Sequence, residues 1–311
     1  MDELWYYSLK FDNCIYRYTK QTFEDFFCKI MKADNDDFRR VKPQGKLGDY
    51  GCDGYIPSTR TFYMCYSPET MNTDSVNQNG KNKITHDLER IVQQWPDVEH
   101  LRYVLNDKYS GIGPELNQLI DSLIEKYKKY DLNLFSMESL KEIFLRLPTD
   151  KKEEIVGYCP DLSKMDPLAE TFSYDAISKI IEYLDKNTAA YYKEDLLIVP
   201  DLSEKITFNK LSDRAAEILN RQKIYIPYVE EFFCKNQEYD KDKLKNQLSR
   251  LYSEACATIP EGDKTFADSR FFYLFDCICF NKKSRTIVDN TFVIIALFFE
   301  SCDIFEAPIH A

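Results

Sequence analysis

Two aspartates in a glycine-rich stretch are the residues of this sequence best suited to chemistry. Residues 45–69 read GKLGDYGCDGYIPSTRTFYMCYSPE, in which Asp49 and Asp53 lie among closely spaced glycines. Glycines permit a tight turn that brings the backbone near a ligand and directs a carboxylate across a sheet edge. The strand expected at 61–67 would place alternate side chains beside that carboxylate. Two carboxylates with a neighbouring cation can hold Mg²⁺ or Mn²⁺ against a phosphate.

The same stretch has a simpler interpretation, in which it is a hairpin whose aspartates only cap its turns. Local charge favours the phosphate interpretation, because residues 38–66 carry an excess of cations in a chain with a formal net charge of −11. The cations of this segment are Arg39, Arg40, Lys42, Lys46 and Arg60, against the carboxylates of Asp49 and Asp53. We expect Arg39, Arg40 and Lys42 to steer a phosphate-bearing substrate toward the site.

Composition excludes several classes of protein. The chain has 41 Lys plus Arg against 52 Asp plus Glu, so a general nucleic-acid coat is not expected. Its 10 cysteines lack paired spacing, which favours free thiols in a reducing cytosol over disulfides or a zinc site. No phosphate-binding GxxxxGK[ST] loop is present, and the most apolar run, residues 292–299, is too short to cross a bilayer. We expect a cytoplasmic protein without membrane contact.

Hydrophobic periodicity predicts a mixed sheet with helices on both faces in the first half of the chain. A helix is expected over 4–33, with Thr22 as an N-cap within it. The remaining elements are strands at 38–41, from 55 and at 61–67, a polar loop at 69–82, and helices at 84–95 and 116–130 alternating with strands at 100–106 and 131–136. The order is therefore helix, three strands, helix, strand, helix, strand.

The second half of the chain is predicted to be mostly α-helical. A short helix is expected at 139–147, and residues 148–170 are rich in proline and charge, as in a linker with some helix. Further helices are expected at 171–184, 211–220, 228–235, 242–257, 268–280 and 290–300. The predicted organisation is a sheet domain at 1–147, a linker at 148–170 and a helical complex-assembly domain at 171–311.

Several phrases of the sequence resemble effectors of the three-component, ATPase-associated (ABC-3C) anti-phage systems, with the Lamassu type as the nearest comparison. GKLGDYGCDGY followed by TFYMCYSPE, then HLRYVLND and GIGPELNQLIDSL, resemble their N-terminal nuclease-like domain. NTFVIIALFFESCDIFEAP resembles the closing segment of their helical domain. The resemblance covers roughly residues 20–136 and 200–308. It implies an SMC- or RecN-like ATPase and a small accessory subunit as partners, and double-stranded DNA as substrate. It leaves self-association of the chain open.

By this resemblance the first domain has the restriction-endonuclease-like, PD-(D/E)xK fold, whose α-β-β-β-α-β order agrees with the periodicity. The resemblance assigns the acid of the first helix to Glu24 and the central metal-binding aspartate to Asp53. The next acid and the lysine of the motif fall on Met64 and Tyr66. A thioether is a soft ligand that does not suit a hard divalent cation. A tyrosine does not supply the cation that stabilises an attacked phosphate.

Other residues are candidates to replace these two. Glu69 is a candidate for the missing acid, and Lys81 or Lys83, ahead of the next helix, for the missing cation. Asp49 is a candidate second metal ligand, with holding the turn as its alternative role. Two hypotheses follow: a Mg²⁺- or Mn²⁺-dependent DNA endonuclease, or a nuclease-fold subunit that has lost catalysis and acts in assembly or regulation. Both predict membership of an anti-phage defence complex.

Overall fold

A computed structural model of the chain describes residues 3–43, 48–69, 79–159, 172–187, 201–262, 265–282, 284–301 and 303–308. The chain divides into two compact units. The sheet unit is Cys14–Ile155, and the helical unit combines Met1–Asn13 with Val156–Ala311. Lys46, residues 70–78 of the expected polar loop and residues 160–170 of the expected linker lie outside the described residues.

The sheet unit is built on five strands whose spatial order follows the chain. They are β1 (Arg39–Arg40), β2 (Gly54–Ile56), β3 (Thr61–Tyr66), β4 (His100–Leu105) and β5 (Asp131–Phe135). The pairs β1–β2 and β2–β3 are antiparallel, whereas β3–β4 and β4–β5 are parallel. The predicted mixed sheet is therefore confirmed.

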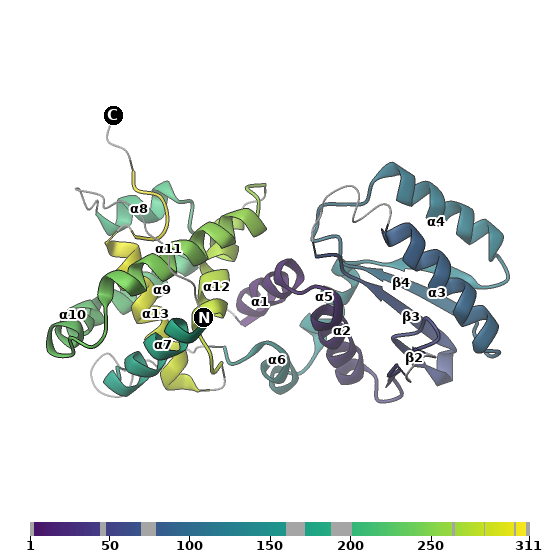
Figure 1. The fold of residues 1–311 in the computed structure, drawn as a ribbon, viewed down its shortest axis with the longest axis horizontal. Helices are drawn as coiled ribbons and strands as arrows, with labels where there is room; N and C mark the ends of the chain where they lie inside the picture. Colours follow the sequence, from purple (N-terminus) through teal and green to yellow (C-terminus); the bar gives the residue numbers. More distant parts are fainter. Residues whose placement is uncertain are drawn as a thin grey trace. The chain divides into compact units, whose positions relative to one another are not determined.

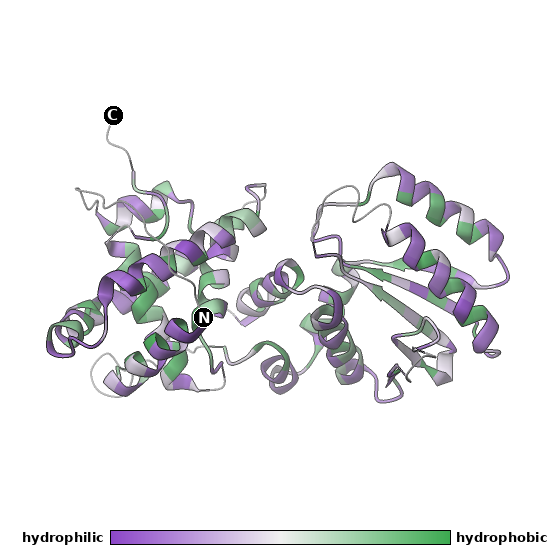
Figure 2. Cartoon of the chain, viewed as in Figure 1, coloured by the Kyte–Doolittle hydropathy of each residue, from purple (hydrophilic) through white to green (hydrophobic). Residues whose placement is uncertain are grey.

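Helices cover both faces of this sheet, as the alternating pattern predicted (Figure 1). They are α2 (Lys20–Asp34), α3 (Gly80–Gln94), α4 (Pro114–Lys126) and α5 (Met137–Arg146), and the short helix α6 (Thr149–Val156) follows α5 in the chain. Helices α3 and α4 pack on one face, and α2 with α5 on the other. The helices are hydrophilic on their outer sides and hydrophobic toward the sheet (Figure 2).

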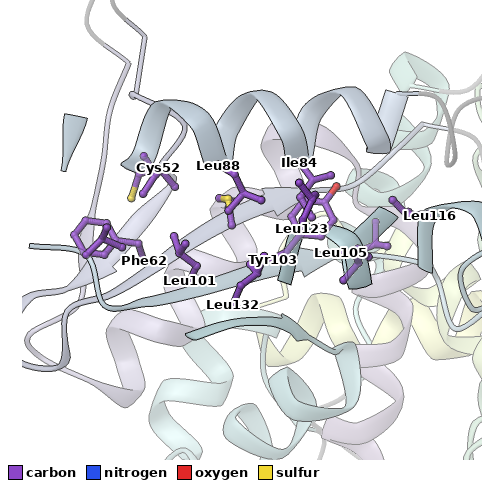
Figure 3. Packing of buried hydrophobic residues seen from close by; sticks show 14 residues of the cluster. Cys52, Phe62, Ile84, Leu88, Leu101, Tyr103, Leu105, Leu116, Leu123 and Leu132 are labelled. Atoms are coloured by element: carbon purple, nitrogen blue, oxygen red, sulfur yellow. The ribbon is translucent and has the colours of Figure 1, made fainter. Parts of the chain in front are cut away.

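Strand β3 is packed on both of its faces, because its side chains alternate between two apolar layers. Phe62 and Met64 enter the layer beneath α3, where Leu88 lies above the sheet (Figure 3). Tyr63 points the other way and packs on Phe27 of α2, with ring centroids 5.3 Å apart. The strand beside the glycine-rich turn is thus fixed from both sides.

The single helix expected over 4–33 is wrong. The structure has two helices, α1 (Glu3–Arg17) and α2, separated by a short break. The buried Asn106 side chain donates to the carbonyl of Ile15 at 2.9 Å, at the end of α1. The N-cap of α2 is Thr19, and Thr22 is its third helical residue, whose hydroxyl accepts from the Thr19 N–H at 3.0 Å. The break is therefore specified by tertiary contacts and capping.

The helical unit contains the start of α1 and the helices from α7 onward. These are α7 (Tyr174–Asn187), α8 (Leu202–Phe208), α9 (Asp213–Gln222), α10 (Ile226–Lys235), α11 (Lys241–Thr258), α12 (Phe266–Ile278) and α13 (Arg285–Glu300). Helix α8 was not predicted. Residues 287–299 of α13 are all buried, and from Phe292 to Phe299 the helix is apolar on every side. Among the described residues, no helix has the length and apolar character needed to span a membrane.

Candidate active site

A pocket of about 530 Å³ lies at the carboxyl end of β3 in the sheet unit. It brings together four predicted acids and one of the two predicted lysines. The charged residues that line it are Lys20, Glu24, Asp49, Asp53, Glu69 and Lys83. These residues come from α2, the glycine-rich turn, the end of β3 and α3, so the pocket depends on the packing of the whole unit.

Asp53 is the buried acid of this pocket, with 6% of its surface exposed. Its Oδ2 accepts a hydrogen bond of 2.5 Å from the Cys65 N–H, and its own N–H donates to the Tyr63 carbonyl at 3.0 Å. Burial raises the pKa of Asp53 to about 7, although the Lys83 charge and the Cys65 hydrogen bond oppose this rise. A second cation placed beside Asp53 would therefore favour its ionised form.

Lys83, on the first turn of α3, is the cation that the structure brings to Asp53. Its Nζ donates to Asp87 Oδ2 at 2.7 Å. Burial by itself lowers the pKa of Lys83, but the charges of Asp87 and Asp53 outweigh it, and the pKa is raised overall. Asp87 was missed from the sequence, although its position four residues after Lys83 is the spacing of a helical ion pair. Lys83 is thus a protonated side chain between two buried carboxyl groups.

The glycine-rich turn is fixed to α3 by close packing. Gly51 has φ +80°, and a Cβ on it would lie 2.6 Å from the backbone oxygen of Asp87. Asp49 Oδ1 accepts a 2.7 Å hydrogen bond from the Gly51 N–H, which is the turn-holding role given above as its alternative. The turn that carries Asp53 and the helix that carries Lys83 are therefore positioned against each other.

Glu24 faces the pocket from α2, but it is already engaged by a cation. Arg40 Nη2 donates to Glu24 Oε1 at 2.9 Å, and the same guanidinium contacts Asp25. Of the three predicted phosphate-steering residues, Arg40 is thus held by acids. The other two, Arg39 and Lys42, are exposed and do not line the pocket.

Two other candidates lie farther from the centre. Glu69 lines the pocket at its exposed rim, where it pairs with Lys20 at 2.7 Å and both side chains are 66% exposed. Lys81 does not line the pocket and pairs instead with Glu115. The structure therefore favours Lys83 over Lys81 as the cation of the site.

Met64 and Tyr66, which stand at the acid and lysine positions of the nuclease motif, lie in different surroundings. Met64 is fully buried in the apolar layer beneath α3, whereas Tyr66 lines the pocket. Across the part of the chain that the structure describes, no group of three or more His, Cys, Asp or Glu side chains is placed to hold a metal ion. Mg²⁺ commonly takes only one or two protein carboxylates, with waters and substrate phosphates as its other ligands. Asp53 with Glu24 fits that mode.

A comparison with protein families assigns the helical unit. Residues 175–272, from α7 to α12, match the model of C-terminal domain 10 of the ABC-three component (ABC-3C) systems. The helical unit carries an ABC-3C C-terminal domain. The chain is accordingly a component of an ABC-3C system, which implies further subunits. A comparison with curated proteins found no match, and neither did a comparison with solved structures.

Gly51→Ala should destabilise the sheet unit of this ABC-3C component by about 2–4 kcal/mol. The alanine would be strained at a positive φ, and its Cβ would also clash with the backbone of α3. Gly111→Ala is the matched control, since Gly111 has φ +75° but nothing within 4 Å of a Cβ, and should cost about 1–2 kcal/mol. The measurement is urea unfolding followed by Trp95 fluorescence after Trp5→Phe, which leaves one of the 2 tryptophans. Equal costs for the two variants would contradict the packing argument.

Proposed function

We propose that this ABC-3C component is the nuclease subunit of an anti-phage defence system, and that its sheet unit cleaves double-stranded DNA. One observation carries the proposal. The buried Asp53 carboxyl, the Lys83 ammonium and the Glu24 carboxylate share one pocket beside the end of a sheet strand. A phosphodiester placed there would meet acids suited to a divalent cation and a fixed positive charge.

In this proposal Asp53 and Glu24 hold Mg²⁺ or Mn²⁺, and a bound ion would lower the pKa of its water and neutralise phosphate charge. Lys83, whose side chain is 35% exposed, stabilises the negative charge that develops on the attacked phosphate. Asp87 fixes the Lys83 ammonium group. A cation supplied by α3 replaces the one that Tyr66 does not provide.

The resemblance and the ABC-3C domain together support the assignment of partners. We propose an SMC- or RecN-like ATPase and a small accessory subunit, with the Lamassu type as the nearest system. The partner would hydrolyse ATP, since this chain has no phosphate-binding loop of the GxxxxGK[ST] kind. A nuclease directed at phage DNA would act in the cytoplasm.

The test is plasmid cleavage by the purified protein, with its partner subunits, in Mg²⁺ or Mn²⁺. Lys83→Gln should lower the rate by about 10²–10³-fold, because it removes a preorganised charge at the phosphate. Lys81→Gln should lower it by less than about fivefold, because it only breaks an exposed ion pair with Glu115. Equal rates for the wild type and Lys83→Gln would remove Lys83 from the mechanism.

A second candidate function is supported by two other observations. Met64 is buried at the acid position of the motif, and Glu24 is held by Arg40. A chain of this kind would have kept the nuclease fold while acting in assembly or regulation. Co-purification with the ATPase, together with no plasmid cleavage by the complete complex in either metal, would favour this function over the first.

A further inference from the structure

A second cavity, of about 800 Å³, lies beside α2 and α6 in the sheet unit. Four cationic side chains line it, namely Lys29 and Lys32 of α2, Arg40 of β1 and Lys151 of α6. Its acidic lining residues are Asp25, Asp36 and Glu154. Of these four cations, only Arg40 was a candidate from the sequence.

Among the described residues, two of the three lysines of this cavity make contacts that an anion could replace. Lys32 donates to the backbone oxygen of Asp36 rather than to its carboxylate. Lys151 pairs with Glu154 at 3.3 Å, where the two side chains are 43% and 62% exposed. Exposed ion pairs contribute little free energy and break readily. These cations can therefore turn to an anion that enters the cavity.

Arg40 connects this cavity to the candidate active site. Its guanidinium lines the cavity, while its hydrogen bond of 2.9 Å goes to Glu24, which lines the pocket of Asp53. Asp25 is a second acceptor of the same group and also lines the cavity. While Arg40 donates to Glu24, the charge of this carboxylate is partly neutralised, and Glu24 therefore binds a metal ion less strongly.

We propose that the cavity is a binding site for a backbone phosphate of the substrate strand, and that this phosphate draws Arg40 away from Glu24. The inference rests on the proposed nuclease function, and it adds a means of control. Guanidinium groups bind phosphate oxygens with two parallel hydrogen bonds, so a phosphate that the cavity lysines also hold can compete with the hydrogen bonds that Arg40 donates to Glu24 and Asp25. Glu24 would then join Asp53 at the metal only when nucleic acid is bound.

The first test measures Mn²⁺ binding by the full chain, by titration calorimetry without DNA. Arg40→Gln should bind Mn²⁺ about two- to fivefold more tightly, because breaking a partly exposed ion pair frees Glu24. Arg60→Gln is the matched control, since it removes the same charge and breaks an exposed pair with Glu99 that lines neither cavity. In the double variant Glu24→Gln/Arg40→Gln the gain should disappear.

The second test uses sulfate as a soluble substitute for a backbone phosphate. The wild type should bind Mn²⁺ more tightly in sodium sulfate than in sodium chloride of equal ionic strength. The variant Lys29→Gln/Lys32→Gln/Lys151→Gln should lose this difference, so that its Mn²⁺ affinity is the same in sulfate as in chloride. A sulfate effect that is the same in both proteins would overturn the proposed phosphate site.

The outcomes also separate this inference from the proposed function. Unchanged Mn²⁺ affinity in Arg40→Gln, or an equal gain in Arg60→Gln, overturns the control by Arg40 and leaves the nuclease proposal standing. Mn²⁺ binding by Asp53→Asn that equals the wild type overturns the proposed metal site itself. If neither the wild type nor Arg40→Gln binds Mn²⁺, both proposals fall.

Discussion

Replacing Asp53 by asparagine is expected to abolish plasmid cleavage and, at neutral pH, to make the sheet unit more stable. Asparagine can still accept the hydrogen bond from the Cys65 N–H, but it carries no charge into the buried pocket. The loss of cleavage should be at least about 100-fold, as for other preorganised electrostatic contacts. Stability and activity would then change in opposite directions, which distinguishes a functional site from a structural one.

The sign of the stability change follows from the raised pKa of Asp53. Its ordinary value is 3.8, and burial raises it to about 7 in the folded chain. Between these two pH values the folded state keeps a proton that the unfolded state has released, so folding stability falls as pH rises through this window. A pKa shift of this size lowers the free energy of unfolding by at most about 4 kcal/mol above this window. Because Lys83 loses a partner, we expect a net gain of about 2 kcal/mol at pH 8.

Urea unfolding followed by Trp95 fluorescence, after Trp5→Phe, tests this prediction. The gain of Asp53→Asn over its parent should shrink as the pH is lowered from about 8 toward 4. Glu69→Gln is the matched control, because that carboxylate is 66% exposed at the rim of the same pocket and should change stability little. A lower stability of Asp53→Asn at pH 8 would show that the attraction between the Lys83 charge and the Asp53 carboxylate outweighs the cost of burying that carboxylate.

The strands and most helices could be predicted because their patterns are local. Alternating and apolar runs specified β3, β4 and β5, and a stripe of Ile84, Leu88 and Ile91 specified α3. The break between α1 and α2 could not be predicted, because no proline or glycine marks it. It is specified by the Thr19 cap together with Asn106, a residue far along the chain whose amide reaches the end of α1.

The candidate site was predicted in part for the same reason. A glycine-rich turn with Asp53 is visible in the sequence, but the choice between Lys81 and Lys83 is not. At about 100° per residue, these two lysines flank opposite sides of the buried stripe of α3. Only the packed structure shows which flank faces Asp53. The contact between Arg40 and Glu24 likewise joins a strand to a helix, and no local pattern predicts it.

The ABC-3C domain is expected to depend on the first helix of the chain, far in sequence from the matched residues. Lys10 of α1 is fully buried and forms an ion pair with Asp276 of α12, whose side chain is 1% exposed. The Lys10 ammonium also lies over the Phe275 ring, 4.7 Å from its centroid. Residues 3–13 thus complete the core of the helical unit, and a fragment that starts at residue 156 would bury Asp276 without Lys10.

Asp276→Ala should destabilise the helical unit by about 3–5 kcal/mol, because it leaves the Lys10 cation buried without its carboxylate. The double variant Lys10→Met/Asp276→Leu should recover most of this loss, since well-packed apolar residues can replace a buried ion pair. Asp175→Asn, which breaks an exposed pair with Lys179, is the control and should cost less than about 0.5 kcal/mol. Unfolding is followed by Trp5, whose ring meets Phe272 at 5.6 Å, after Trp95→Phe. A cost for Asp276→Ala no larger than that of the control would show that α1 does not support the domain.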